Sequence, residues 1–308
     1  MDQVNQTKVG TNAESQTKQK LVRIDLRRRG KLKLKLMIFI IGAISIFSNG
    51  LLANPKGKAR ILVVMSAADF ILLDGVTKHP TGVFLNELYF PVKTLSDKGH
   101  QIVFATPLGK ISTIDPESVR AKYWKSIAEK EEAIQFLFSL TNFKNPISLE
   151  QAIKDDQNFV GILVPGGQGL MTDLLYDEKI PELLRRFHKK QKPIGIVCHA
   201  PALLTSLRLD KEKENFIFKG YQVNSVTKME EWFIETFVMK GKPKVRNISG
   251  SLKDLGMEYK SSFLPGRSYA IRDRNLVTSQ NPFSGEEFSE MYWKAVEDYL
   301  QMNPSLTD

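Results

Sequence analysis

Short apolar runs alternate with amphipathic stretches of helical length from Lys58 to the end of the 308-residue chain. The apolar runs are rich in β-branched residues and have the length of buried strands. They cover residues 60–65, 101–106, 159–164 and 194–197. The stretches with helical spacing cover residues 82–98, 118–140, 174–190 and 286–300. Repeated strand–turn–helix units predict a mainly parallel sheet with helices on both faces, which is a three-layer α/β sandwich.

The last third of the chain completes this pattern with shorter elements. Residues 221–227 are predicted to form a strand, and residues 268–271 and 276–279 a hairpin. No internal repeat or interdomain linker interrupts the sequence after residue 56. Residues 57–308 are therefore expected to form a single domain.

Residues 1–56 are predicted to lie outside this domain. Residues 1–20 are polar, and a cationic run at 27–35 precedes an apolar segment that ends in small residues. This order is typical of a secretory signal, and residues 36–53 also have about the minimum length of a membrane helix. We expect an exported protein, either periplasmic or anchored to a membrane through residues 36–53. If the leader is a start-site artefact, the protein is cytoplasmic.

The net charge of +10 does not indicate a nucleic-acid-binding protein. Residues 1–36 hold ten Lys/Arg against three Asp/Glu, so most of the positive charge belongs to the leader. No basic patch with interleaved aromatic residues follows. The single cysteine excludes an internal disulfide framework, and the four histidines show no spacing typical of a zinc helix. We predict neither a structural metal nor a cofactor.

The single cysteine, Cys198, follows directly on the apolar run 194–197 and precedes a helix-like run. A residue at such a strand-to-helix turn is held in a sharp elbow at the carboxyl edge of the sheet, where ligands bind in parallel sheets. The positive end of the following helix favours a thiolate there. Cys198 is thus a candidate nucleophile, with His199 as a neighbouring proton carrier. The alternative is an inert buried thiol.

Glycines mark a second turn, at Gly166-Gly167, after the predicted strand 159–164. Only a glycine turn lets the backbone approach a substrate closely, so the N–H groups of Gly167 and His199 are candidate oxyanion donors. A tight turn without a catalytic role is the alternative.

Seven short motifs follow one another along residues 60–300. They are Thr81-Gly82 with Glu87 and Pro91, Thr106-Pro107-Leu108-Gly109, Asp115-Pro116-Glu117-Ser118, Val164-Pro165-Gly166-Gly167, Val197-Cys198-His199-Ala200-Pro201, Thr227 with Glu230-Glu231, and residues 276–282. With these motifs the chain resembles the ThiJ/PfpI superfamily, in its branch of glyoxalase III-like enzymes and heat-shock chaperones. The resemblance implies a flavodoxin-like, class I glutamine amidotransferase-like fold. Gln168, Ala200 and Ser279 depart from residues common in the family.

The resemblance also implies roles for residues that the pattern alone leaves open. Glu87 would otherwise be taken as a solvent-facing glutamate, and Glu231 as a charge at an acidic helix start. By resemblance, Glu87 reaches the Cys198 thiol as a protonated carboxyl with a raised pKa, and Glu231 orients His199 as the third member of a triad. Glu230 is the alternative for that third position.

The expected function is that of a glutathione-independent glyoxalase in stress or detoxification. Such an enzyme converts methylglyoxal or a similar 2-oxoaldehyde into a 2-hydroxy acid, D-lactate for methylglyoxal, through a hemithioacetal on Cys198. A homodimer is expected from the resemblance. Two alternatives remain open: a holding chaperone, and a cysteine-dependent amidase or peptidase that uses the same residues.

Overall fold

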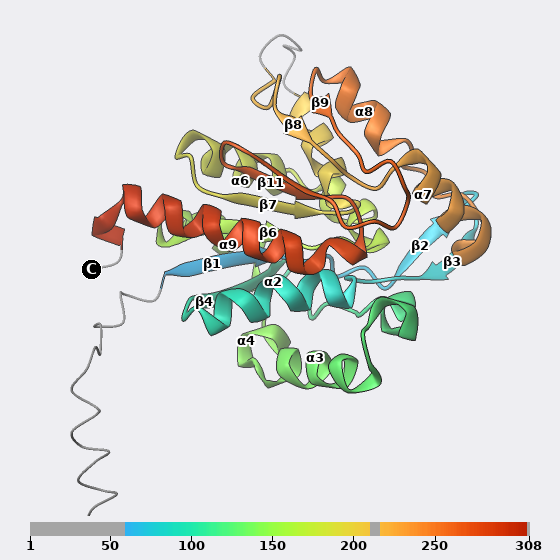
Figure 1. Cartoon of the computed structure of the whole chain (residues 1–308), viewed down its shortest axis with the longest axis horizontal. Coiled ribbons are helices and arrows are strands. Elements are labelled where there is room, and N and C mark those ends of the chain that lie inside the picture. The colour runs from blue at the N-terminus through green and yellow to red at the C-terminus, as the bar shows by residue number, and fades with distance from the viewer. Residues whose placement is uncertain (1–58, 210–215, 307–308) are drawn as a thin grey trace, which may run out of the picture. The chain divides into compact units, whose positions relative to one another are not determined.

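A seven-stranded sheet lies at the centre of the computed structural model, which describes residues 59–209 and 216–306 (Figure 1). The strand order is β10-β11-β7-β6-β1-β4-β5. The strands are β1 (Arg60–Val64), β4 (Gln101–Thr106), β5 (Ile147–Ser148), β6 (Phe159–Val164), β7 (Ile194–Val197), β10 (Ala270–Asp273) and β11 (Leu276–Ser279). Within this sheet, only the pair β10–β11 is antiparallel. This mainly parallel sheet confirms the predicted fold class.

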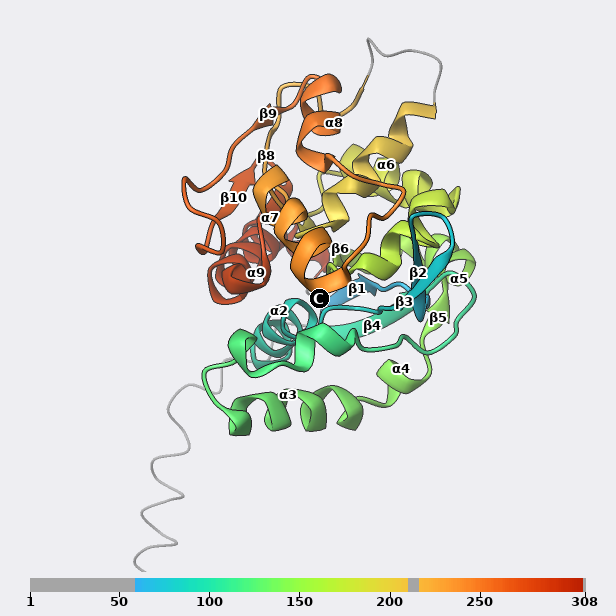
Figure 2. The same ribbon diagram turned by 90° about the vertical axis from the view of Figure 1, so that its right-hand side faces the viewer.

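Helices cover both faces of the sheet. Figure 2 shows α2 (Leu85–Asp97) and α9 (Gly285–Met302) on one side, and α5 (Leu149–Lys154) and α6 (Lys179–Lys189) on the other. Glycine in two strands lets α9 approach closely: a Cβ on Gly195 would lie 2.7 Å from the ring of Tyr292, and one on Gly161 2.8 Å from its hydroxyl. The outer helix α3 (Ile127–Ser139) packs on α2. The result is the expected three-layer sandwich.

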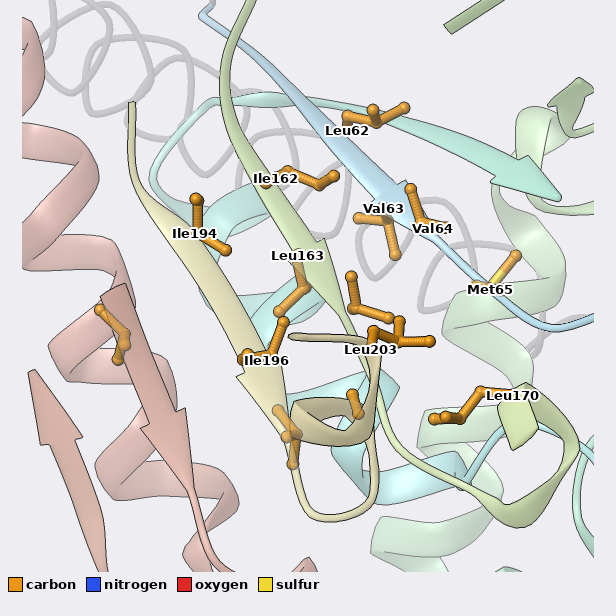
Figure 3. Close-up of a cluster of buried hydrophobic side chains, with 14 of the residues drawn as sticks. Leu62, Val63, Val64, Met65, Ile162, Leu163, Leu170, Ile194, Ile196 and Leu203 are labelled. Carbon is orange, nitrogen blue, oxygen red and sulfur yellow. The ribbon is translucent and has the colours of Figure 1, made fainter. Parts of the chain in front are cut away.

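The core is densest around the central strands. Leu62, Ile162 and Ile194 come from three adjacent strands and are at most 1% exposed. Figure 3 shows them together with Leu203 of the 3₁₀ helix η6 (Ala200–Leu209). Burying each side chain of this size contributes about 1.5–3 kcal/mol. Strand β7, which leads into Cys198, is therefore held by its neighbours on both sides.

Some predicted boundaries were wrong, for identifiable local reasons. The helix predicted at 174–190 begins only at Lys179, because Pro181 lacks an N–H and is suited to a first helical turn. The helix predicted at 118–140 is interrupted, and α3 starts anew where the Ser126 side chain accepts a hydrogen bond from the Glu129 N–H. The strand predicted at 221–227 is reduced to β8 (Gln222–Val223).

One hairpin was not predicted at all. It consists of β2 (Phe70–Leu73) and β3 (Thr77–Pro80) and forms a separate two-stranded sheet. Its turn contains Asp74 and Gly75, both with positive φ (48° and 80°). An Asp-Gly pair between apolar residues is the sequence signal that would have revealed it.

The predictions for the leader concern residues 1–56, which lie outside the described residues. Within residues 59–209 and 216–306, no helix has both the length and the hydropathy required to span a bilayer.

Candidate active site

Cys198 occupies the turn between β7 and η6. Its φ of 60° lies in the left-handed region, which costs a residue with a Cβ roughly 1–3 kcal/mol. Two backbone hydrogen bonds hold the turn: the Cys198 N–H donates to the Ser279 carbonyl (2.8 Å), and the Cys198 carbonyl accepts from the Val226 N–H (2.9 Å). The end of β11 and the segment after β8 thus fix the thiol at the carboxyl edge of the sheet, where the sequence predicted it.

His199 lies in contact with the thiol. Its Nδ1 is 3.2 Å from the Cys198 Sγ, and its Nε2 is 2.9 Å from the side-chain nitrogen of Gln168. Burial lowers the pKa of His199 to about 4. The imidazole is therefore neutral at neutral pH and able to accept a proton.

Gln168 is the residue that the sequence analysis did not assign to the site. It was noted only as a departure from the family, yet it is the side-chain partner of His199 at Nε2. The Gln168 amide is buried, and its Oε1 has no hydrogen-bond partner among the described residues. As placed, the Gln168 amide N–H donates to Nε2, which leaves the ring proton on Nδ1. Turning the amide so that Oε1 faces the ring puts the proton on Nε2 and frees Nδ1 to accept one from the thiol, and we adopt this orientation for the reaction.

Glu87 lies behind the thiol, in the first turn of α2. It is 1% exposed, so it faces the interior rather than solvent. Its carboxyl adjoins the Cys198 thiol and the Gly166 backbone, although neither oxygen has a well-formed hydrogen bond to the described residues. Burial raises the pKa of Glu87 to about 8, against the opposing effect of these two neighbours. The carboxyl is therefore mainly protonated at neutral pH.

The surroundings of the sulfur disfavour its ionised form. Burial raises the pKa of the Cys198 thiol well above its ordinary value; an ionised Glu87 would raise it further, and the charge of Glu230 acts in the same direction. The His199 backbone N–H opposes them. Burial therefore opposes the ionisation that the elbow position predicts: the side chain is only 4% exposed, and desolvation penalises the charged form.

The predicted glutamate of the triad does not contact His199. Both Glu231 oxygens accept backbone N–H groups at the start of α8 (Ile248–Asp254), from Asn247 (3.0 Å) and Ile248 (3.2 Å). Glu231 and His199 border one small void, with no hydrogen bond between them. The carboxylate therefore secures a helix start, and the assignment of Glu231 as the group that orients His199 was wrong.

Glu230, the alternative for that position, is also engaged elsewhere. It forms a capping box with Thr227 at the start of α7 (Lys228–Phe233). Its Oε1 accepts from the Gly266 N–H (2.9 Å), Gln280 (3.0 Å) and Asn281 (2.9 Å). The Thr227-Glu230 spacing is a capping signal, which explains its use here without a catalytic role.

A cavity of about 490 Å³ opens above Cys198 and His199. Gly167, with a φ of 113°, lines it beside Gln168. Gly166, Glu87 and Glu231 do not line it. Gly167 and His199 thus border the cavity together with Cys198, while Glu87 adjoins the thiol from outside the lining.

Gly166 is required for the contact between the thiol and Glu87. A Cβ at this position would lie 2.9 Å from the Cys198 Cβ and in still closer contact with a Glu87 oxygen. We expect Gly166→Ala to lower the free energy of unfolding by about 1–3 kcal/mol and to reduce turnover at least tenfold, because Cys198 and Glu87 must move apart. Urea unfolding and turnover assays measure the two effects.

Gly75→Ala is the matched control for that substitution. Gly75 has a φ of 80° and no atom within 4 Å of its added Cβ, so its replacement strains a turn away from the site. Turnover should stay unchanged in this variant. Full activity in Gly166→Ala would show that the glycine is not needed for the site.

No three His, Cys, Asp or Glu side chains are grouped as metal ligands within the described ranges. The chemistry available at the site is that of a thiol, a neutral imidazole and a protonated carboxyl, with backbone N–H groups alongside.

Residues 81–295 match the model of the DJ-1/PfpI family. This match spans most of the chain, which therefore belongs to the DJ-1/PfpI family, as the motifs indicated. Among its relatives are proteins named protein/nucleic acid deglycase HchA. The one from Pseudomonas aeruginosa is 24% identical over 249 residues, 78% of this chain and 82% of that protein. The one from Staphylococcus aureus is 24% identical over 248 residues, 78% and 80% of the two chains.

Solved structures share the fold. Glyoxalase III from Candida albicans is 21% identical with a TM-score of 0.62, over 77% of this chain and 97% of that one. The 24-kDa rapid encystment protein of Francisella tularensis is 24% identical with a TM-score of 0.64, over 77% and 98%. At these identities the structural comparisons establish the architecture.

Proposed function

We propose that the protein is a glutathione-independent glyoxalase that converts 2-oxoaldehydes into 2-hydroxy acids. The observation that carries this proposal is the arrangement at one cavity floor: the Cys198 thiol, the His199 imidazole at 3.2 Å, and the protonated Glu87 behind them. The named relatives, deglycases and a glyoxalase III, support an activity of the deglycase or glyoxalase type.

The first step is addition of the thiol to the aldehyde carbon. As the C–S bond forms, the thiol proton passes to His199 Nδ1 and from there to the former aldehyde oxygen, which gives a hemithioacetal. The backbone N–H groups of Gly167 and His199 are the donors for the developing oxyanion. Proton removal during attack suits a thiol that is not ionised at rest.

The second step moves hydrogen from one carbon to the next. Neutral His199 removes the C1 proton while Glu87 protonates the C2 carbonyl oxygen, which gives an enediol. Glu87 then takes the C1 hydroxyl proton as His199 returns a proton to C2, which gives a thioester of the 2-hydroxy acid. Water cleaves the thioester and restores the thiol, so that methylglyoxal and water give lactate and one proton. The two pKa directions suit these roles, because His199 must start neutral and Glu87 protonated.

The direct test is to incubate the purified protein with methylglyoxal in the absence of glutathione and to assay D-lactate. Formation of D-lactate supports the proposal. A stable acyl-enzyme after exposure to a peptide or ester, with no D-lactate from methylglyoxal, would favour the amidase or peptidase alternative. Export through the leader is part of the proposal and is tested separately, by the N-terminus and the location of the mature protein.

Gln168 is expected to act through His199. We predict that Gln168→Ala lowers kcat about tenfold with little change in KM, because the imidazole loses the partner that fixes its protonated nitrogen. Gln168→Glu should restore part of the rate and shift the acidic limb of the pH–rate profile to higher pH, because a carboxylate raises the pKa of His199. Steady-state kinetics across pH measure both effects. A pH profile unchanged in both variants would contradict this role.

A further inference from the structure

The cavity above Cys198 is much larger than a three-carbon aldehyde requires. Its volume of about 490 Å³ lies within the range of about 300–1,000 Å³ that is typical of sites for drug-sized ligands. Methylglyoxal has only five non-hydrogen atoms. Most of the space is therefore left for another part of the substrate, beyond the reacting carbons.

The wall of this space is aromatic and aliphatic. The aromatic side chains that line it are Phe84, Tyr123, Trp232, Phe233 and Phe283. Tyr123 packs between two of them, with ring centroids 5.0 Å from Phe84 and 5.6 Å from Phe283. The charged groups in the lining have partners within the protein. Lys122 pairs with Glu117 at 2.6 Å, Asp115 accepts from the Thr81 hydroxyl at 2.9 Å, and Glu230 accepts from two side-chain amides. The wall thus favours an apolar group over a charged one.

Residues of α7 and of the π-helix that follows it, Ile234–Met239, also line the cavity. π-Helical turns are rare and occur frequently at functional sites. Trp232 and Phe233 remain 56% and 49% exposed while lining the cavity. Phe237 contacts both of them, with centroids at 5.8 Å and 5.0 Å. Large exposed aromatic side chains grouped at a cavity mouth mark a binding surface.

From these observations we propose that the substrate of this site carries a bulky apolar group, so that aryl or long-chain 2-oxoaldehydes are preferred over methylglyoxal. This inference rests on the proposed function and specifies its substrate class. Trp232 and Phe233 are the specificity-determining residues, since they hold the part of the substrate that does not react. The reaction of phenylglyoxal has the same stoichiometry as that of methylglyoxal. One molecule of water is consumed, the hydrogen moves from C1 to C2, and mandelate and one proton are formed.

The experiment compares phenylglyoxal and methylglyoxal as substrates of the full chain, by assaying mandelate and lactate. A single methylene in an apolar pocket changes kcat/KM by about 10–200-fold, so we expect kcat/KM for phenylglyoxal to exceed that for methylglyoxal at least tenfold. Trp232→Ala and Phe233→Ala should each lower the ratio of the two kcat/KM values at least fivefold. Phe263→Ala is the matched control, because Phe263 is 98% exposed and does not line the cavity. In this variant the ratio of the two kcat/KM values should equal that of the wild type.

A binding measurement separates this inference from the proposed function. Calorimetric titration of Cys198→Ala, which cannot turn over substrate, should show mandelate binding at least tenfold more tightly than lactate. Trp232→Ala introduced into that variant should remove the difference. Tighter mandelate binding without turnover of either aldehyde would overturn the proposed function and leave the apolar site standing. Turnover with a preference for methylglyoxal, or equal binding of the two acids, would overturn the inference.

Discussion

Replacing Cys198 by alanine is expected to abolish D-lactate formation, with a fall of at least about 10⁴-fold in kcat/KM. Every covalent intermediate of the proposed reaction contains the sulfur, and no other cysteine exists in the chain. His199 would still line the cavity, but it would have no thiol to deprotonate. The measurement is D-lactate produced from methylglyoxal at matched protein concentrations.

Cys198→Ser is the control for altered packing at the elbow. Serine keeps the shape of the side chain and accepts the same φ, while its hydroxyl is a far weaker nucleophile than the thiol at this pH. We expect it to be as inactive as the alanine variant and to unfold at the same urea concentration as the wild type. Wild-type turnover in either variant would rule out the thiol chemistry.

The second large effect is expected for Glu87→Gln. Removing one positioned acid–base group costs about 10²–10⁴-fold in rate, and glutamine keeps the volume of the buried side chain. The wild-type kcat/KM should rise with pH through about 4, where His199 becomes neutral, and fall through about 8, where Glu87 ionises. In Glu87→Gln the fall near pH 8 should disappear, and a pH–rate profile with its alkaline limb intact would contradict the assignment.

Glu87 also makes stability depend on pH in a defined direction. Its pKa is raised from 4.5 to about 8 on folding, so the folded state binds the proton more tightly than the unfolded chain. The contribution of this group to the free energy of unfolding is therefore fully present below pH 4.5. It is lost as the pH rises towards 8, by up to about 1.4 kcal/mol per pH unit. Glu87→Gln should lack this loss. Urea unfolding of both proteins between pH 5 and pH 8 measures this. The free energy of unfolding of the wild type is expected to fall steadily relative to that of Glu87→Gln as the pH rises.

The order of strands and helices could be predicted from sequence because both depend on local periodicity. The runs at 101–106, 159–164 and 194–197 coincide with β4, β6 and β7, since buried strands of a parallel sheet are continuous apolar segments. Boundaries that depend on capping were missed, as at Ser126 and Pro181. There a single hydrogen bond, or a missing N–H, decides where a helix begins.

The position of Cys198 was equally a local property. A strand followed at once by a helical run places the intervening residue at the sheet edge whatever the rest of the chain does. The assignment of Glu231 failed because the spacing of the motif does not show which N–H groups a carboxylate meets. The start of α8, sixteen residues further along, takes both of its oxygens.

The sequence by itself determined the α/β sandwich, the family and the elbow that carries the sulfur, because each follows from residues close together in the chain. Only the tertiary structure decided that both Glu231 oxygens serve the start of α8, that Gln168 is the side chain beside His199 Nε2, and that burial raises the pKa of the Cys198 thiol. These three outcomes depend on desolvation and on contacts between elements far apart in sequence, such as α2, β6 and β7. Burial of a titratable group, unlike periodicity, is a property of the assembled fold.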